Sequence, residues 1–546
     1  MLAVAALFTL ANAPKPLVVD DAAYYYYARH IAQHPTDPYG FEVFWEDLPT
    51  PALHLLAPVV FSYWWAGAIA LFGDNPLLWK LWLFPFALIL AHSLLALYRR
   101  LTPGLEIPLT WLTVFSPTLL PSFNLMLDVP ALAFGLLCVE RFARACERGD
   151  LRHALLAGVI GGVAMQTKYA SVTLVGAMLA WGWSFDRRRL AAGAAVAAGT
   201  AFIAWECFLI ARYGESHFLR ALLYGQGSGS MHRGFELVSG LVAILGAVAP
   251  GLAILGQVAM RAPAWMVAAS CGMALLIFAV LPALPALPVA GLVFSPEFGA
   301  QSSELFLFTA LGGVVVATFA LVFRALLREP DPARSATGSF LLAWLAIEVL
   351  GFALLNPFMA ARRAMGIAVV LTAAAGQLAV RNGIGGGERL LRVAVGFSLA
   401  LGLFFLTSDH LDAVARRRAA PRIAEELRAL GAKPAEESVW VAGHWSYQYY
   451  TERLGMKQLI AGRTRLSRGD WVVVARGVAR QRLPGIRSVS PPLVSFAVSN
   501  GWPWSTLPWG YAGPLPMRRQ PRAQIQVSIH RMLADEALGP LPPAEP

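Results

Sequence analysis

Long apolar runs fill the first 407 residues of the chain, and short clusters of arginine and lysine separate them. A helix needs about 20 apolar residues to cross a bilayer, and cytoplasmic loops collect Lys and Arg. If all the strongly basic clusters face the cytoplasm, an even number of spans must separate one cluster from the next. The apolar runs then predict transmembrane helices at 107–121, 129–145, 153–167, 170–185, 190–211, 237–258, 263–288, 304–326, 337–356, 364–380 and 393–407.

Two further helices complete the predicted membrane domain, which covers residues 1–407. Residues 1–17 predict a short first span, and a second span lies between residue 77 and the Arg99-Arg100 pair. Residues 53–72 are also apolar, but a span there would move every later basic cluster to the outside, and prolines make a poor entry to a span. We therefore predict that 53–72 lie on the outer membrane surface. The result is an all-α polytopic fold of about 13 transmembrane helices with a long first external loop, 18–76.

The polar pattern changes after residue 407. Residues 421–431 predict an amphipathic helix that ends at Gly431. Short apolar runs predict strands at 439–442, 471–475 and 525–529, with a helix at 445–455 between the first two. We expect residues 408–546 to form a small α/β domain on the external side, because the thirteenth span delivers them there.

The composition excludes a soluble protein. Hydrophobic residues make up 57% of the 546 residues and charged residues only 14%, whereas soluble proteins carry about 25% charged residues. The formal charge is +11, of which the tail from Thr407 contributes +8, from 19 Lys and Arg against 11 Asp and Glu. A basic external domain favours anionic partners such as lipid head groups or phosphates, and ordinary colloidal charge is the alternative. We expect no nucleic-acid partner.

An acidic pair, Asp20-Asp21, follows the first apolar run and precedes a cluster of tyrosines, Tyr24 to Tyr27. One interpretation is an interfacial pair that caps a helix beginning near Ala22. The other is a catalytic carboxylate pair that opens an external site, with Tyr24 and Tyr27 available to stack on a sugar or to line a binding surface. Interfacial aromatic belts also contain tyrosine, so the cluster alone does not decide between them.

Other unusual charges fall at external span ends in the same topology. Asp128 lies in the second external loop, Lys168 and Tyr169 lie in the third, and Arg362 and Arg363 lie between the eleventh and twelfth helices. Each has a structural alternative, because an acid suits the start of a helix and a lysine can extend to the interface. Charges at a membrane boundary are nevertheless functional candidates by default.

Together these residue types suggest transfer chemistry. A carboxylate can take a proton from an acceptor hydroxyl or amine. Asp20, Asp21 and Asp128 are also the candidate ligands if a divalent cation binds, with Mg or Mn preferred over Zn because no His or Cys accompanies them. Lys and Arg can neutralise a phosphate leaving group, and a guanidinium can bind it in a bidentate manner.

At these residues the sequence resembles the C-type (GT-C) membrane glycosyltransferases, above all protein O-mannosyltransferases and lipid A aminoarabinose transferases. The resembling motifs are Asp20-Asp21 with a tyrosine-containing helix ending in Ala28-Arg29, then Leu127-Asp128-Val129-Pro130, Gln166-Thr167-Lys168-Tyr169, and Ala361-Arg362-Arg363. The family commonly has Asp-Glu at the first motif and a tyrosine where this chain has Arg363.

The resemblance implies a polyprenyl-phosphate-linked sugar donor and an acceptor outside the cytoplasm, which can be a lipid, a glycan or a protein. It implies single displacement with inversion, in which Asp20 is the base and Asp21 orients it or helps bind metal. Asp128 is the second acidic motif, and Lys168 and Arg362 stabilise the phosphate, with Arg363 and Tyr169 as further phosphate ligands.

The implied location is the inner (plasma) membrane, with the active site and the C-terminal domain outside the cytoplasm. A flippase or transporter for polyprenyl-linked glycans or lipids is the alternative function. It would explain Glu206 and Glu348, two acids within predicted spans that the transferase hypothesis leaves unused.

Overall fold

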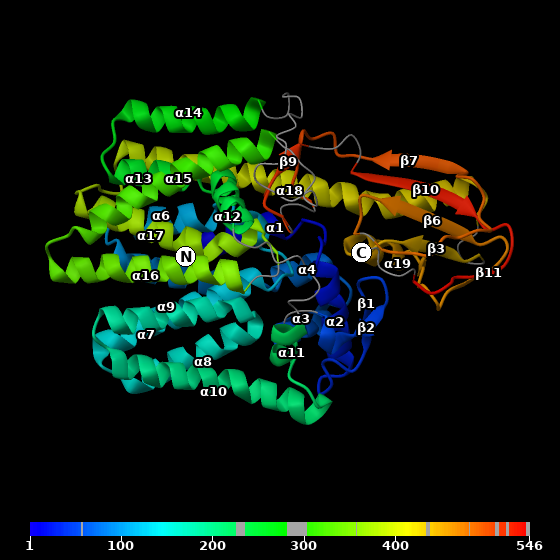
Figure 1. Cartoon of the computed structure of the whole chain (residues 1–546), viewed down its shortest axis with the longest axis horizontal. Coiled ribbons are helices and arrows are strands. Elements are labelled where there is room, and N and C mark those ends of the chain that lie inside the picture. The colour runs from blue at the N-terminus through cyan, green and yellow to red at the C-terminus, as the bar shows by residue number, and fades with distance from the viewer. Residues whose placement is uncertain are drawn as a thin grey trace.

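The computed structural model describes residues 1–55, 58–224, 235–280, 303–355, 358–432, 437–479, 481–507, 511, 513–519 and 524–541. A helical bundle occupies one end of the molecule and a β-sheet with its surrounding loops occupies the other (Figure 1). The segments of the predicted first loop, residues 18–76, lie between the bundle and the sheet and border both.

The bundle consists of helices from almost the whole length of the chain. They are α1 (Leu2–Asn12), α4 (Pro76–Leu81), α5 (Phe84–Leu101), α6 (Glu106–Val114), α7 (Asp128–Arg148), α8 (Leu151–Thr167), α9 (Val172–Ser184), α10 (Arg188–Tyr213), α11 (His217–Tyr224), α12 (Phe235–Val248), α13 (Pro250–Ala259), α14 (Ala264–Val280), α15 (Ser303–Leu327), α16 (Pro332–Leu354), α17 (Met365–Arg381) and the first part of α18 (Arg389–Ala429). Short 3₁₀ turns adjoin several of them: η2 (Leu120–Ser122), η3 (Tyr169–Ser171) and η6 (Ala361–Ala364).

Local sequence signals set the boundary between α7 and α8. Gly149 ends α7 in a left-handed conformation, with φ of +66°, which glycine adopts without strain. The Asp150 side chain then accepts hydrogen bonds from the backbone N–H groups of Arg152 and His153 and caps α8. Gly158 lets α8 approach α10 closely, because a Cβ there would lie 2.1 Å from the Ala194 carbonyl oxygen.

The external loop predicted at 18–76 is largely ordered. It contains α2 (Asp21–Gln33), a hairpin of β1 (Glu42–Phe44) and β2 (Pro49–Pro51), the turn η1 (Ala52–His54), and α3 (Ser62–Phe72). α3 has only 11 residues, about 17 Å of helix. It is too short to cross a bilayer core of about 30 Å, in agreement with the placement of 53–72 outside the spans.

Six helices in the described ranges are long and apolar enough to cross a membrane, or seven if α12 and α13 form one span. The predicted helix at 237–258 is in fact broken, because α12 and α13 meet at 78° and Pro250 cannot continue the hydrogen-bond ladder. The predicted span at 1–17 is not supported, because α1 has 11 residues and is as short as α3. α6 ends at Val114, before the predicted 121. The count of 13 spans stays a prediction, and part of 263–288 lies outside the described residues.

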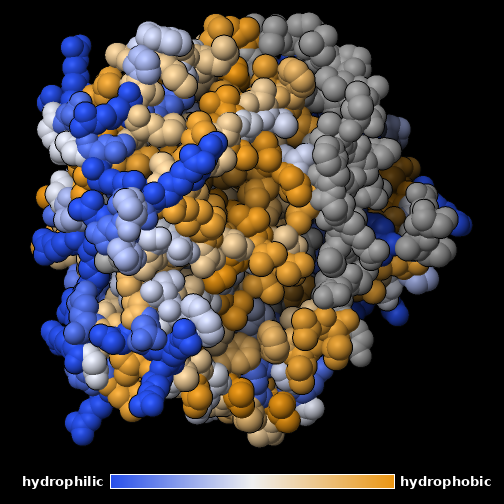
Figure 2. Space-filling model, turned by 60° about the vertical axis from the view of Figure 1, so that its left-hand side comes forward, coloured by the Kyte–Doolittle hydropathy of each residue, from blue (hydrophilic) through white to orange (hydrophobic). Residues whose placement is uncertain are grey.

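The surface of the bundle is divided by polarity. Figure 2 shows hydrophilic residues gathered toward one end and hydrophobic residues covering the area beside them. Large apolar side chains on α10, α14, α15 and α16 are exposed, among them Ile203, Leu275, Val316 and Leu350. An apolar band of this kind is the surface that lipid would cover.

The C-terminal sheet has the strand order β4-β3-β6-β10-β7, formed by β3 (Val439–Ala442), β4 (Lys457–Gln458), β6 (Trp471–Arg476), β7 (Val494–Val498) and β10 (Ile525–Arg531). β3 runs parallel to β4 and β6, and β10 runs antiparallel to β6 and β7. Two-stranded pairs join β5 (Arg465–Leu466) with β11 (Glu536–Ala537) and β8 (Trp504–Ser505) with β9 (Arg518–Arg519). The predicted strands are confirmed, and so is the helix between the first two, α19 (Ser446–Glu452).

Helix α18 corrects two predictions. It continues for 41 residues, so the helix expected to end at 407 and the separate helix expected at 421–431 are one element. Its second part packs Ala419, Ile423 and Leu427 against the sheet. The predicted domain boundary between 407 and 408 therefore lies inside a continuous helix.

Candidate functional site

A strained turn directs the two acids of the Asp20-Asp21 pair to different places. Val19 has a positive φ of +38°, which is rare for a β-branched residue and is maintained only when its surroundings hold it. The backbone N–H of Val18 donates to Asp21 Oδ2 at 3.0 Å, and the N–H of Asp21 returns a bond to the Val18 carbonyl at 2.9 Å. Asp21 is thus held in the turn and is fully buried, while the side chain of Asp20 meets α7 and η6 through Arg362.

Arg362 connects Asp20 to Asp128. Its Nη2 donates to Asp20 Oδ2 at 3.2 Å, and its Nε lies 3.3 Å from Asp128 Oδ2. Lys168 Nζ donates to the other oxygen of Asp128 at 2.5 Å. Four residues that are far apart in the sequence therefore form one chain of charges: Asp20, Arg362, Asp128 and Lys168.

Asp20 and Asp128, the two acids of this charged cluster, differ in how far their side chains are exposed to solvent. The Asp20 side chain is 22% exposed and has one cation partner, whereas that of Asp128 is 8% exposed and has two. Burial raises the pKa of Asp20, and Arg362 opposes that rise. Burial likewise lowers the pKa of Lys168, against the pull of the Asp128 carboxylate. Asp20 is therefore the more accessible carboxylate and the one whose affinity for a proton is raised.

Arg363 lies beside these four charged residues. In the part of the molecule that the structure describes, no carboxylate pairs with it. Its Nη1 donates to the Phe358 carbonyl at 2.8 Å, and its guanidinium lies 3.8 Å from the centre of the Phe358 ring. Its Nε is buried and has no hydrogen-bond acceptor. A half-buried arginine whose buried Nε has no acceptor is an arrangement that a phosphate oxygen can complete.

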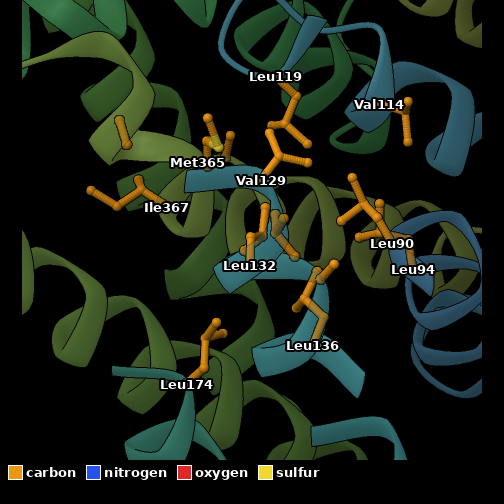
Figure 3. Close-up of a cluster of buried hydrophobic side chains, with 14 of the residues drawn as sticks. Leu90, Leu94, Val114, Leu119, Val129, Leu132, Leu136, Leu174, Met365 and Ile367 are labelled. Carbon is orange, nitrogen blue, oxygen red and sulfur yellow. The ribbon is translucent and has the colours of Figure 1, made fainter. Parts of the chain in front are cut away.

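A cavity of about 70 Å³ lies beside four of these groups, and Asp20 is not part of its lining. Its polar lining includes Asp128, Lys168, Arg362, Arg363 and Glu348, and its apolar lining includes Leu132, Leu174, Phe352 and Met365. Figure 3 shows how apolar side chains fix the first turn of α7, with Val129 and Leu132 near Met365. The charged groups thus stand on rigidly packed elements, beside apolar walls.

Glu348 belongs to this cavity, and the sequence offered no partner for it. Its Oε1 accepts a hydrogen bond from Trp344 Nε1 at 3.1 Å. Its carboxylate lies over Gly366, where a Cβ would come within 2.3 Å of Oε2. No cation pairs with Glu348 in the described ranges, so it is a carboxylate in a membrane helix that faces the same cavity as Lys168 and Arg363.

Glu206, by contrast, has a structural explanation. It accepts hydrogen bonds from Gln166 Nε2 at 3.0 Å, from the Ser216 hydroxyl at 2.6 Å and from the backbone N–H of Phe218 at 3.1 Å. The carboxylate therefore holds the start of α11, which is the favourable end of a helix for a negative charge.

The structure does not bring Tyr169 or Tyr27 to the charged cluster. The Tyr169 hydroxyl lies 3.2 Å from Glu206 Oε1 and 2.7 Å from His217 Nδ1. Tyr27 is 1% exposed, and its hydroxyl donates to the Ala52 carbonyl at 2.6 Å. Both tyrosines hold secondary-structure elements together, and neither hydroxyl reaches the charged cluster in this structure.

Tyr24 is the tyrosine of the cluster that lies near the acids. Its ring packs against Trp65 with the ring centres 5.5 Å apart. Burial raises its pKa well above the ordinary value, and the charges of Asp20 and Asp128 raise it further. Tyr24 is itself buried and does not line the cavity, so its use as a substrate-stacking residue stays a prediction.

The three aspartates do not converge on one point. Arg362 already occupies the position between Asp20 and Asp128 that a divalent ion would take. Asp21 belongs to a different environment, where burial raises its pKa to about 6 and Lys80 opposes the rise. No cluster of three or more metal-ligating side chains occurs in the ranges that the structure describes.

No protein-family model and no curated protein matches the sequence. Among solved structures, the chain is similar to two crystal structures of ArnT from Cupriavidus metallidurans. The structure bound to undecaprenyl phosphate aligns over 87% of this chain and 92% of ArnT, with 15% identity and a TM-score of 0.41. The apo structure aligns over 86% and 91%, with 14% identity and a TM-score of 0.42.

Proposed function

We propose that the chain is an integral membrane glycosyltransferase that moves a sugar from a polyprenyl-phosphate-linked donor to an acceptor outside the cytoplasm. One observation carries the proposal: an accessible carboxylate, Asp20, pairs with Arg362, which lines a cavity together with Asp128 and two further cations, Lys168 and Arg363. A base beside a phosphate-binding surface is the minimum that transfer from a lipid phosphate requires.

Asp20 is the base in this proposal. The acceptor hydroxyl or amine attacks the anomeric carbon of the sugar and gives its proton to the Asp20 carboxylate. The bond between that carbon and the phosphate oxygen breaks, and the phosphate leaves with the electron pair. A single displacement of this kind inverts the configuration at the anomeric carbon.

Arg363 and Lys168 bind the phosphate. The family resemblance suggests Arg362 as the phosphate ligand. We prefer Arg363, because Arg362 is already paired with two carboxylates. Charge-assisted bonds from these two cations would strengthen as the leaving phosphate gains charge. Asp128 fixes the positions of Lys168 and Arg362, since it forms an ion pair with each of them.

In this proposal the donor binds over the mouth of the cavity, which at about 70 Å³ is too small to enclose a lipid-linked sugar. Its phosphate meets Lys168 and Arg363, its sugar reaches Glu348, and its hydrocarbon chain follows the apolar wall of Leu132, Leu174 and Phe352. Glu348 is the hydrogen-bond acceptor on that wall that can take a bond from a sugar hydroxyl or amine.

Transfer of radiolabelled sugar from a purified polyprenyl-phosphate donor by the purified protein tests the proposal. We expect labelled acceptor with wild-type protein and none with Asp20→Asn. Movement of the lipid-linked sugar across vesicles without transfer would instead support the flippase hypothesis.

A further inference from the structure

Arg362 has a third partner, which comes from the C-terminal part of the chain. Its Nη1 donates to the backbone carbonyl of Tyr511 at 2.9 Å, and its guanidinium carbon lies 5.4 Å from the centre of the Tyr511 ring. Arg362 is 7% exposed. The guanidinium that connects Asp20 and Asp128 is therefore also held by a residue 149 positions later in the sequence.

Tyr511 is itself fixed by its hydroxyl group. The hydroxyl donates to Asp409 Oδ2 at 2.8 Å and accepts a bond from Asn124 Nδ2 at 3.0 Å. Its neighbour along the chain adds a backbone link, because the N–H of Gly513 donates to the Met359 carbonyl at 2.7 Å, close to η6. The ring of Tyr511 is thus held between α18 and the segment before α7.

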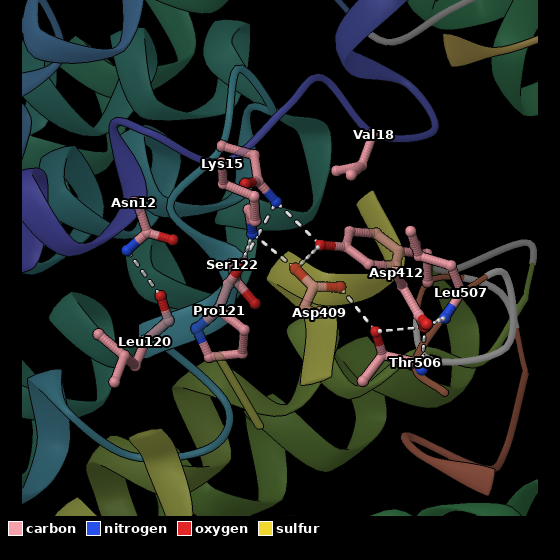
Figure 4. A network of polar contacts seen from close by, with 12 residues as sticks. Asn12, Lys15, Val18, Leu120, Pro121, Ser122, Asp409, Asp412, Thr506 and Leu507 are labelled. Atoms are coloured by element: carbon pink, nitrogen blue, oxygen red, sulfur yellow. Dashed lines mark hydrogen bonds and ion pairs between the residues drawn. The ribbon is translucent and has the colours of Figure 1, made fainter. Parts of the chain in front are cut away.

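Asp409 is held in turn by a buried network of polar contacts (Figure 4). Lys15 Nζ binds Asp409 Oδ2 at 2.6 Å, and the Thr506 hydroxyl donates to Asp409 Oδ1 at 2.8 Å. Asp412, one turn further along α18, accepts the backbone N–H of Thr506 at 2.7 Å and that of Leu507 at 3.1 Å. These bonds attach residues 505–507 to α18, close to Tyr511 in sequence.

We propose that Tyr511 is a positioning residue for Arg362, so that the C-terminal part of the chain completes the active site. This inference rests on the transferase function proposed above. Tyr511 limits the positions open to a long arginine side chain, and Arg362 in turn sets the place and charge environment of Asp20. The C-terminal region is then required for each turnover, beyond any role in acceptor capture.

The experiment compares Tyr511→Phe and Tyr511→Ala with wild type, as full-length protein in detergent. Tyr511→Phe keeps the ring and the backbone carbonyl and loses the hydroxyl bonds, so it should retain more activity than Tyr511→Ala. We expect kcat to fall by about 10- to 100-fold in Tyr511→Ala, since small displacements of catalytic groups have effects of this size. The KM for the donor should change little, because Lys168 and Arg363 stay in place.

A pH profile separates positioning from a general loss of folding. If Arg362 moves away from Asp20, the acidic limb of kcat/KM shifts upward by about 0.5–1 unit, a part of the effect of a full neighbouring charge. Tyr98→Phe is the control, because its buried hydroxyl contacts Thr113 at 2.8 Å and no residue of the site. Its pH profile should match wild type.

Two results overturn the inference. One is a Tyr511→Ala protein with the kcat and acidic limb of wild type. The other is a loss of activity in Tyr511→Ala that leaves the acidic limb in place and is matched by Tyr98→Phe. A wild-type protein that neither transfers sugar nor binds polyprenyl phosphate would reject the proposed function itself, so the two failures are distinguishable.

Discussion

Arg362 Nη2 donates to Asp20 Oδ2 at 3.2 Å across 342 residues of sequence. The pair joins the residue before α2 to η6, which directly precedes α17. It also means that the proposed base is never an isolated carboxylate, because a guanidinium accompanies it.

Removal of the proposed base should stop transfer without preventing donor binding. In Asp20→Asn the side chain keeps its size and loses its ability to accept a proton, so kcat should fall by about 10²–10⁴-fold. Binding of polyprenyl phosphate, measured by calorimetry, should be preserved. Asp47→Asn, in the same external loop and paired with Arg482, is the matched control. Transfer at the wild-type rate by Asp20→Asn would refute the assignment.

The acidic limb of kcat/KM should report Asp20. Burial raises its pKa above the ordinary 3.8, and a base acts only when deprotonated, so activity should fall as the pH drops through that raised value. Arg362→Gln removes the charge that opposes the rise. The limb should then move to still higher pH, by about 1 unit or more. A limb that stays in place in Arg362→Gln would contradict the role of Asp20.

The two arginines should differ in their effect on phosphate binding. Arg363→Ala removes a cation with free donors, so the affinity for polyprenyl phosphate should fall by about 10- to 100-fold, the size of a hydrogen bond to a charged group. Arg362→Ala should reduce kcat more than it reduces this affinity, because its donors serve the two carboxylates. Equal loss of affinity in both variants would favour Arg362 as a phosphate ligand.

Glu348 offers a differential test of the donor's orientation. If its carboxylate contacts the sugar, Glu348→Ala should weaken binding of the sugar-loaded donor while binding of bare polyprenyl phosphate stays at the wild-type level. A lost hydrogen bond of this kind corresponds to about 1.5–3 kcal/mol. If Glu348 only supports the packing of α16 on α17, both ligands should weaken together. Glu206→Gln, which alters a carboxylate outside the cavity, is the control for both ligands.

Stability should depend on the buried pair of Lys15 and Asp409. The two side chains are 0% and 1% exposed, so Lys15→Met leaves a buried charge unpaired and should cost about 3–5 kcal/mol. The double variant Lys15→Met with Asp409→Asn should recover part of that loss, since asparagine is neutral and can still bond to Thr506. Thermal unfolding in detergent measures both. A double variant no more stable than Lys15→Met would argue against an electrostatic origin.

The sequence was most informative where the signal was local. Apolar runs located most helices, and the C-terminal strands were found from short buried runs with few competing patterns. Charge and topology predicted that Asp20, Asp128, Lys168 and Arg362 lie on the same side of the membrane. They did not predict which of these residues pair with one another. Pairing depends on rotamers and on packing between distant elements, which periodicity does not encode.

Three features required the three-dimensional structure. The turn at Val19 separates Asp20 from Asp21, and nothing in the residue types announces a positive φ at a valine. The polar run around Arg416 and Pro421 interrupts the apolar pattern of α18, although the helix continues through it. Tyr511 lies in a tail rich in proline, glycine and tryptophan, where no periodic signal points to a contact with Arg362.

The length of α18 has a consequence for engineering the chain. At about 1.5 Å per residue its 41 residues extend about 62 Å, twice the thickness of a bilayer core. Each added residue would turn everything beyond it by about 100°. A single insertion just before Asp409 would therefore rotate Asp409 away from Lys15, and an attempt to express the sheet alone would cut through the element that supports it.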